Sequence, residues 1–317
     1  MFKYFRMYKV ILFFFTLFIS QSGFSQLTAD NLKALQNKED SLKSYSTEII
    51  WGRNAEERFK ADSMFTRMFV RALQIKGSIH YPFDSLITIS KLSPKDSSFK
   101  IFTWQLVIND NLVRQHGAIQ MKTNDGSLKL FPLIDKSSAI DNTHDTIANN
   151  FGWVGAVYYQ LIEKKLSGNS VYTLLGYDEN NLNSNKKIIE ILTFQNREPV
   201  FGGGHFSFPD NKLQKNRVAR YIMEYKKNAS PRLTYDQDLD MIIFEHLISE
   251  TGEPNKKYTY IPDGDYEGMK WTDGKWVHIS KVFTEVTPDG QAPIPQPLRD
   301  AKGNIDESKL ERRFPVE

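Results

Sequence analysis

Cysteine is absent from the 317-residue sequence. Disulfide bonds and thiolate metal ligands are therefore excluded, and so is a lipid attached to an N-terminal cysteine. Without disulfides, the folded state depends on its core alone. The hydrophobic fraction of 40%, with 13% aromatic residues, is that of a folded globular protein.

Motifs for catalysis and metal binding are also missing. The chain has no G-x-S-x-G nucleophile motif. Its six histidines lie far apart, without the spacing of a zinc helix or a zinc knuckle, at positions 80, 116, 144, 205, 246 and 278. We therefore predict no catalytic residue, no metal site and no cofactor. Enzymatic activity stays open, with a non-enzymatic protein favoured.

Excess charge of one sign is missing as well. The sequence has 41 Lys and Arg against 38 Asp and Glu, and residues 1–25 hold three basic and no acidic residues. Removal of this segment leaves 38 charges of each sign, so the basic isoelectric point belongs to the N-terminus. Nucleic acid is therefore not predicted as a partner.

Residues 1–25 have the pattern of a cleavable signal peptide. Three basic residues precede an apolar run from Val10 to Ile19, and small residues stand at the −3 and −1 positions before Gln26. The run is too short for a stable membrane anchor, and no later run approaches the roughly 18–20 apolar residues needed to cross a bilayer. We expect export to the periplasm or the extracellular space.

Two helices are predicted within residues 26–76. Apolar residues recur every seven positions and form one stripe, at Leu35, Leu42 and Ile49. Gly52 interrupts the pattern, and Asn54 with Glu57 forms a capping-box arrangement at the start of the second helix. We interpret the pair as a helical layer over one face or edge of a β domain. The alternative is a partner-binding coiled segment.

The rest of the chain is predicted to be mainly β. Residues 77–98 read as a connector, and from Phe99 the apolar period changes to two. About ten or more strands follow within residues 99–287. The predicted fold class is mainly β (α+β overall), a helical pair followed by a large antiparallel β meander, a sandwich or a curled, half-barrel sheet. Residues 288–317 form a Pro-rich, charged tail.

Two turns in the β region can be interpreted in detail. With Asp273-Gly274 as a two-residue turn, Trp271 lies opposite Trp276. The polar run that begins at Asp178 is predicted to be an Asn-rich turn. An EF-hand is excluded there because positions 183 and 189 hold Asn and Ile instead of Gly and Glu.

Two sets of side chains are candidates for a site. Three aspartates alternate along one predicted strand and would share a face that binds a cation or acts as an acid/base pair, at Asp236, Asp238 and Asp240. Their alternative place is an exposed strand or turn, paired with basic residues. Four aromatic residues are candidates for a sugar-stacking surface or, alternatively, for the core: Trp271, Trp276, Tyr158 and Tyr159.

The strand-and-turn run YTLLGYDENN at residues 172–181, continued by SNKKIIEILTF and PVFGG, resembles exported proteins of unknown function from Bacteroidota. The resemblance extends over most of residues 80–287. It implies export and supplies no catalytic residue.

Three functions follow from these observations. The first is a non-enzymatic exported protein that binds or scaffolds at the cell envelope, with an envelope component or glycan as partner. The second is an envelope glycan or peptide hydrolase that uses the aspartate-rich strand. The third is a periplasmic carrier of a small molecule or lipid.

Overall fold

The computed structural model describes residues 27–109, 111–209 and 218–283. The predicted signal peptide (1–25) and Pro-rich tail (288–317) lie outside the described residues. Every described helix and strand belongs to one compact unit, which ends at Val282. Of the described residues, 44% are strand and 21% are helix, which confirms the predicted mainly β fold class.

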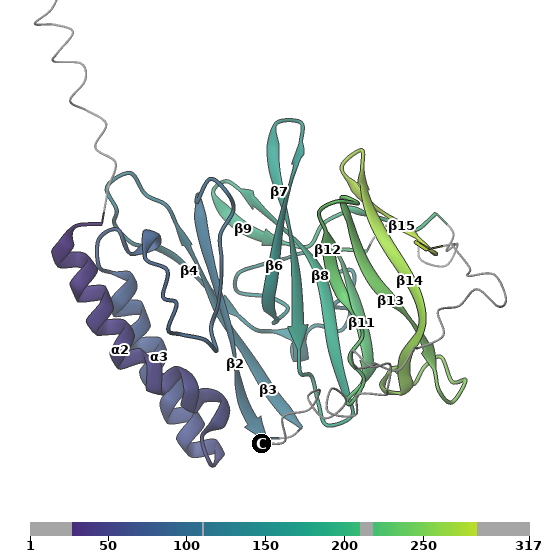
Figure 1. The fold of residues 1–317 in the computed structure, drawn as a ribbon, viewed down its shortest axis with the longest axis horizontal. Helices are drawn as coiled ribbons and strands as arrows, with labels where there is room; N and C mark the ends of the chain where they lie inside the picture. The colour runs from purple at the N-terminus through teal and green to yellow at the C-terminus, as the bar shows by residue number, and fades with distance from the viewer. Residues whose placement is uncertain (1–26, 110, 210–217, 284–317) are drawn as a thin grey trace, which may run out of the picture. The chain divides into compact units, whose positions relative to one another are not determined.

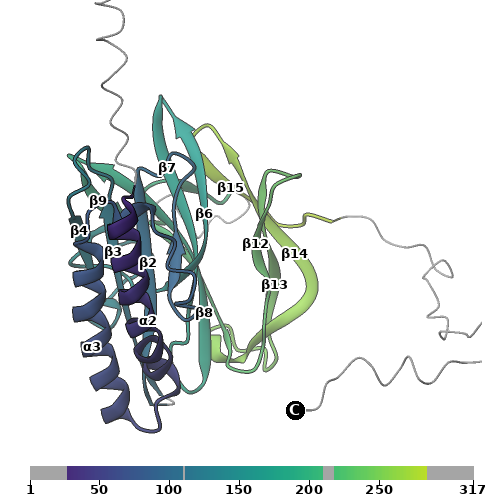
Figure 2. The same cartoon turned by 60° about the vertical axis from the view of Figure 1, so that its left-hand side comes forward.

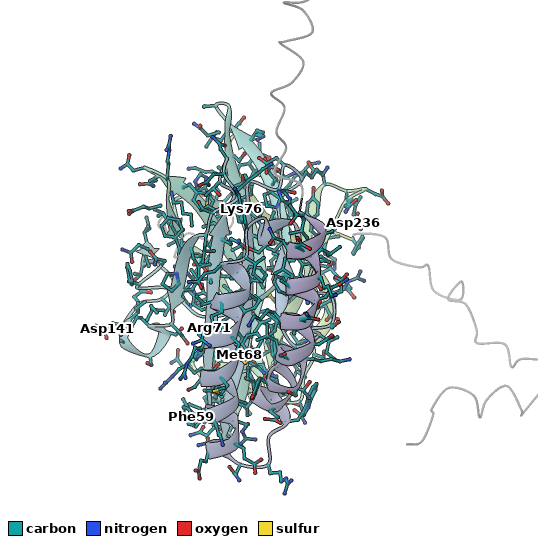
Figure 3. The ribbon with its side chains drawn as sticks, turned by 90° about the vertical axis from the view of Figure 1, so that its left-hand side faces the viewer. Phe59, Met68, Arg71, Lys76, Asp141 and Asp236 are labelled. Atoms are coloured by element: carbon teal, nitrogen blue, oxygen red, sulfur yellow. The ribbon has the colours of Figure 1, made fainter. Side chains whose placement is uncertain are left out.

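Helices α2 (Ala29–Trp51) and α3 (Ala55–Leu73) lie side by side (Figure 3). The predicted cap is confirmed, because the Asn54 side chain accepts a hydrogen bond from the Glu57 N–H at 2.9 Å. The Glu57 carboxylate accepts from the N–H of Arg53, one residue before the position that a capping box reaches. Among the described residues, no helix is both long and apolar enough to span a membrane.

The helices cover one face of a four-stranded antiparallel sheet, called sheet I here. Its strand order is β1 (Ser90–Leu92), β2 (Phe99–Asn109), β3 (Leu112–Met121) and β4 (Lys129–Ile134). The predicted stripe of α2 packs with side chains of β2 in one buried cluster that includes Leu42, Phe102 and Trp104. The interpretation of the helical pair as a layer over the β domain is therefore confirmed.

The predicted connector is more structured than its composition indicates. It contains a short 3₁₀ helix, Ser78–His80, and the edge strand β1 of sheet I. Phe83 and Leu86 are fully buried in the cluster between the helices and sheet I. Residues 77–98 therefore contribute side chains to the core and do not merely link two parts of the chain.

Sheet II lies next to sheet I. Its strands run in the order β5 (Ala148–Asn149), β9 (Glu198–Phe201), β8 (Ser184–Gln195), β7 (Asn169–Asp178) and β6 (Val157–Leu166), and β11 (Arg220–Lys226) also pairs with β8. Phe99 and Ile119 of sheet I share a buried cluster with Leu174 and Ile188 of sheet II. This cluster holds the two sheets face to face.

Sheet III covers the other face of sheet II. Its order is β10 (Phe206–Ser207), β15 (Lys275–Ile279), β14 (Tyr260–Thr272), β13 (Met241–Ser249) and β12 (Leu233–Asp236). Leu175 and Ile189 of sheet II pack with Phe244 and Met269 of sheet III. Figures 1 and 2 show the resulting sequence of layers: the helices, then β2 and β3, then β6 to β8, and then β12 to β15.

The described strands therefore form three sheets and not a single large one. All pairs among these strands are antiparallel except β10 with β15. The predicted register of the last hairpin is confirmed: Asp273 and Gly274 have positive φ values of 49° and 81°, and Trp271 lies opposite Trp276. Sheet II is covered on both faces, which explains the near-continuous apolar runs of β7 and β8.

Candidate functional site

A cavity of about 600 Å³ opens at the seam between sheets I and II. It lies where β3 begins, β4 ends and the β7–β8 hairpin turns. We call it the cationic pocket and define it by five of its lining residues, Arg114, Gln115, Lys136, Asp178 and Lys186. Its volume falls within the range of about 300–1,000 Å³ that is usual for small-molecule sites.

Strand alternation explains why Asp178 and Lys186 reach this cavity. The two residues are directly paired across β7 and β8. They lie on the same face of sheet II as Leu174 and Ile188, which pack against sheet I. The row of apolar side chains that packs sheet II against sheet I therefore ends in the charged pair Asp178 and Lys186, which lines the cavity.

Gln115 and Asp178 form the buried base of the pocket. Gln115 is 3% exposed and Asp178 is 9% exposed. The Gln115 Nε2 donates to Asp178 Oδ1 at 2.9 Å, and the Asn180 N–H donates to the same oxygen at 3.0 Å. Burial raises the pKa of Asp178 above its ordinary value. Gln115 Oε1 is buried and has no hydrogen-bond partner among the described residues.

Asp135 forms one wall of the cavity and is held rigidly. Its Oδ1 accepts the Ser137 N–H at 2.9 Å and the Gly155 N–H at 3.3 Å. Its Oδ2 accepts the Gln115 N–H at 3.2 Å. A Cβ atom on Gly155 would lie 2.4 Å from the Gln115 Cβ, so only glycine permits this close approach. Asp135 is thus a fixed structural carboxylate.

The cations of the pocket are free to bind a ligand. Arg114 and Lys136 are exposed and Lys186 is half-buried. Among the described residues, none of these three side chains has a hydrogen bond or an ion pair. Asp135 and Asp178 already accept hydrogen bonds, and the three cations outnumber these two carboxylates, so the pocket suits an anionic group.

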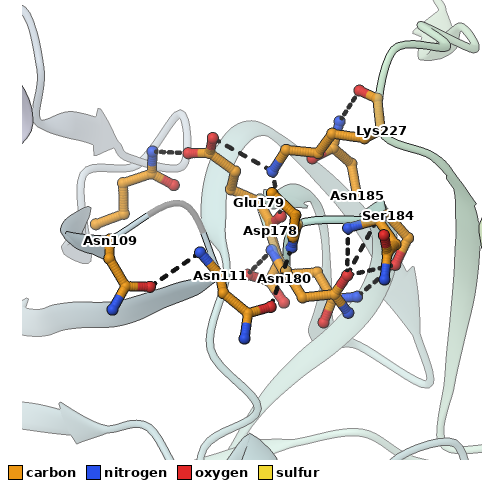
Figure 4. A network of polar contacts seen from close by, with 12 residues as sticks. Asn109, Asn111, Asp178, Glu179, Asn180, Ser184, Asn185 and Lys227 are labelled. Atoms are coloured by element: carbon orange, nitrogen blue, oxygen red, sulfur yellow. Dashed lines mark hydrogen bonds and ion pairs between the residues drawn. The ribbon is translucent and has the colours of Figure 1, made fainter.

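Polar contacts fix the β7–β8 turn at the edge of the pocket (Figure 4). Asn180, with a positive φ of 53°, donates from Nδ2 to the Ser184 Oγ at 2.7 Å. Ser184 Oγ donates to Glu224 of β11 at 2.6 Å, and the Leu182 N–H donates to Asn111 at 3.3 Å. The predicted Asn-rich turn is confirmed, and it is tied both to sheet II and to the β2–β3 loop.

The predicted aspartate face does not exist. Asp236 ends β12, and residues 237–240 form the turn to β13. Asp236 Oδ1 accepts the N–H groups of residues 238 and 239 at 3.0 Å, an Asx turn. Asp240 has a positive φ of 50° and forms an ion pair with Lys164. Turn formation, and not strand alternation, explains the aspartate spacing.

The aromatic candidates do not assemble on one surface. Trp276 is fully buried and donates to Thr173 Oγ1 at 2.8 Å. Tyr158 is also fully buried and donates to Glu190. Trp271 is partly buried and packs edge-on against Trp276 at a centroid distance of 5.3 Å. Only Tyr159, at 41% exposure, lies at the surface, where it lines a different cavity.

The structure also brings together histidines that lie far apart in sequence. His246 Nδ1 is 2.7 Å from Asp263 Oδ2, and its Nε2 is 3.6 Å from Glu267 Oε1. His278 Nε2 is 2.6 Å from Glu267 Oε2. Their proximity comes from the pairing of β13, β14 and β15, so sequence spacing carried no signal of it. Within the described part of the chain, no three His, Asp or Glu side chains have a geometry that could hold a metal ion.

The residues of the cationic pocket were likewise missed by the sequence patterns. Arg114 and Gln115 lie in β3, within the predicted β region, but their shared site with Lys186 depends on how sheets I and II stack. Comparisons of the chain with protein-family models, with curated proteins and with solved structures find no match.

Proposed function

We propose that the protein is an exported, non-enzymatic β-rich protein that binds a small anionic molecule in the cationic pocket at the cell envelope. The observation that carries the proposal is the set of three cationic side chains that form no hydrogen bond or ion pair among the described residues, placed around a buried Gln115–Asp178 pair. The signal-peptide pattern of residues 1–25 supports export.

The walls of the pocket favour an anion that also has an apolar part. Leu112 is 49% exposed and Ile134 is 40% exposed, and both line the cavity. A carboxylate or phosphate would bind Arg114 and the lysines, while an attached hydrocarbon would cover these two side chains. The pocket between the two sheets thus supports the carrier function. The hydrolase function lacks support, because the aspartates proposed as its acid/base strand lie in a turn.

Binding of octyl phosphate measured by calorimetry tests the proposal. Inorganic phosphate supplies the charge alone, and octanol supplies the hydrocarbon alone. We expect octyl phosphate to bind most tightly, and to bind more weakly as salt concentration rises. Octanol binding as tightly as octyl phosphate would refute the assignment of an anion site.

A double variant identifies the residues responsible. We expect Lys136→Gln with Lys186→Gln to weaken octyl phosphate binding by more than about tenfold, since a hydrogen bond to a charged group contributes about 1.5–3 kcal/mol. Lys33→Gln, on the exposed side of α2, is the matched control and should bind as the wild type does. Equal affinity in the double variant and the control would contradict the proposal.

A further inference from the structure

A second cavity, of about 450 Å³, lies on the opposite face of the same hairpin. We call it the tyrosine pocket and define it by six of its lining residues, Tyr159, Tyr177, Asn185, Lys187, Tyr225 and Ser230. Together with Ala229 these residues come from β6, β7, β8, β11 and the loop after β11. The cavity is therefore built mostly on the regular strands of sheet II.

The same alternation that builds the cationic pocket builds this one. Tyr177 pairs directly with Lys187 across β7 and β8, one position from the Asp178–Lys186 pair. Tyr177 and Lys187 share the face of Leu175 and Ile189, which pack against sheet III. Next to these apolar residues, the same face of the sheet carries the Tyr177 ring and the Lys187 amine, which line the cavity.

Aromatic surface is the main feature of the tyrosine pocket. The Tyr159 hydroxyl donates to the Leu233 carbonyl at 2.9 Å, while the residue stays 41% exposed. Its phenol end is therefore fixed to β12, and its ring is left to contact a ligand. Lys187 Nζ lies 5.9 Å from the centroid of this ring.

Hydrogen-bonding groups surround the rings. Burial raises the pKa of Tyr177 to about 12 and raises that of Tyr225 further, so both hydroxyls stay protonated at neutral pH and can donate and accept. Asn185 is 7% exposed, and its Nδ2 donates to the Lys227 carbonyl at 2.9 Å. The Asn185 Oδ1 is buried and has no partner among the described residues, so it is an acceptor for a hydroxyl brought by a ligand.

We propose that the tyrosine pocket is a carbohydrate-binding site for a pyranose with equatorial hydroxyls, such as a glucose or N-acetylglucosamine unit. Such a sugar has an apolar face of C–H groups that covers an aromatic ring, and an edge of hydroxyls that bond to amide and phenol groups. Neither a carboxylate nor a histidine is among the lining residues, so the site does not suit a metal ion, and the Lys187 amine is a hydrogen-bond donor for a sugar hydroxyl.

The proposal is independent of the anion site, since the two cavities share no lining residue. The experiment is a titration of the full chain with cellobiose and with chitobiose, the N-acetylglucosamine disaccharide, followed by saturation-transfer NMR and calorimetry. N-acetyltyrosinamide serves as a comparison ligand for an aromatic peptide side chain. We expect at least one disaccharide to bind and to receive saturation at its ring C–H protons.

Paired substitutions separate the ring from its hydroxyl. Both Tyr159→Ala and Tyr159→Phe lose the bond to Leu233, but only the alanine variant loses the ring. We expect Tyr159→Ala to weaken disaccharide binding by about 2- to 12-fold relative to Tyr159→Phe. Near-UV circular dichroism and the melting temperature check that both variants are folded.

Three results would overturn the carbohydrate assignment. These are failure of both disaccharides to bind at millimolar concentration, equal affinity of folded Tyr159→Ala and Tyr159→Phe, and tighter binding of N-acetyltyrosinamide than of either sugar. The last result would assign the pocket to an aromatic side chain of a protein partner instead.

Discussion

Replacement of Asp178 by Asn tests the charge state at the base of the cationic pocket. Burial is the largest cause that raises the Asp178 pKa above 3.8, and Asp135 acts in the same direction. The Asn180 N–H, the Lys186 charge and the Gln115 amide oppose the shift without reversing it. The Asp178→Asn variant keeps an Oδ1 acceptor for its two hydrogen bonds and has no group that ionises.

The sign of the effect follows from proton binding. Between its unfolded and its raised folded pKa, Asp178 binds more protons in the folded state than in the unfolded state. The free energy of unfolding of the wild type therefore falls as pH rises from 3.8 towards the folded pKa. One such group contributes a slope of at most about 1.4 kcal/mol per pH unit. The variant lacks this slope, so its stability relative to wild type should increase with pH and then become constant.

Urea denaturation followed by tryptophan fluorescence, at intervals from pH 4 to pH 8, measures this difference. Asp125→Asn is the control, since hydrogen bonds from Ser127 lower the pKa of the exposed Asp125. The stability of this variant relative to wild type should fall only as pH rises towards 3.8, so from pH 4 to pH 8 it should stay nearly constant and should not rise. A difference for Asp178→Asn that is flat or decreases between pH 4 and pH 8 would refute the reasoning.

Two further substitutions test the packing around the pockets. Arg220→Met leaves Glu190, its fully buried partner at 2.7 Å, without an opposite charge. The variant should therefore lower the free energy of unfolding in urea by about 3–5 kcal/mol. The double variant Glu190→Gln with Arg220→Met should lose less stability, and an equal loss would contradict the pairing. Gly155→Ala forces a Cβ against Gln115. It should therefore lower the free energy of unfolding by about 1–3 kcal/mol and also weaken octyl phosphate binding. Unchanged stability would contradict the close packing of Gly155 against Gln115.

Features set by neighbouring residues could be predicted from the sequence. The cap at Asn54 depends on one side chain and an N–H three residues away. The pairing of Trp271 with Trp276 depends only on the two-residue turn between them, since Asp and Gly accept the positive φ that such a turn demands. Such local rules operate whatever lies above or below the strand.

The hypothesis of a cation or acid/base face at the aspartates is wrong, whereas the alternative of an exposed turn paired with a basic residue is confirmed, because the same spacing fits two local structures. Alternating aspartates suit one face of a strand, but Asp also accepts hydrogen bonds from the backbone two or three residues ahead and tolerates positive φ. In the structure Asp236 forms those bonds and Asp240 adopts that φ. The partner that fixes Asp240 is Lys164 on β6, which no pattern near the turn reveals.

The two pockets depend on features that local sequence rules do not determine. Period-two alternation is sufficient to place Tyr177 and Asp178 on opposite faces of β7, and their partners Lys187 and Lys186 on the same two faces of β8. Alternation does not determine what lies above each face. Sheet I covers one face of the β7–β8 hairpin and sheet III covers the other, and both leave the end of the hairpin open. Neighbouring residue pairs of the same two strands therefore line separate cavities of different chemistry.

A shift of the β7–β8 register by one residue would exchange the two sets of side chains, and it would also move Leu174 and Leu175 to the wrong clusters. The apolar packing that fixes the register therefore also fixes which pocket is cationic and which is aromatic.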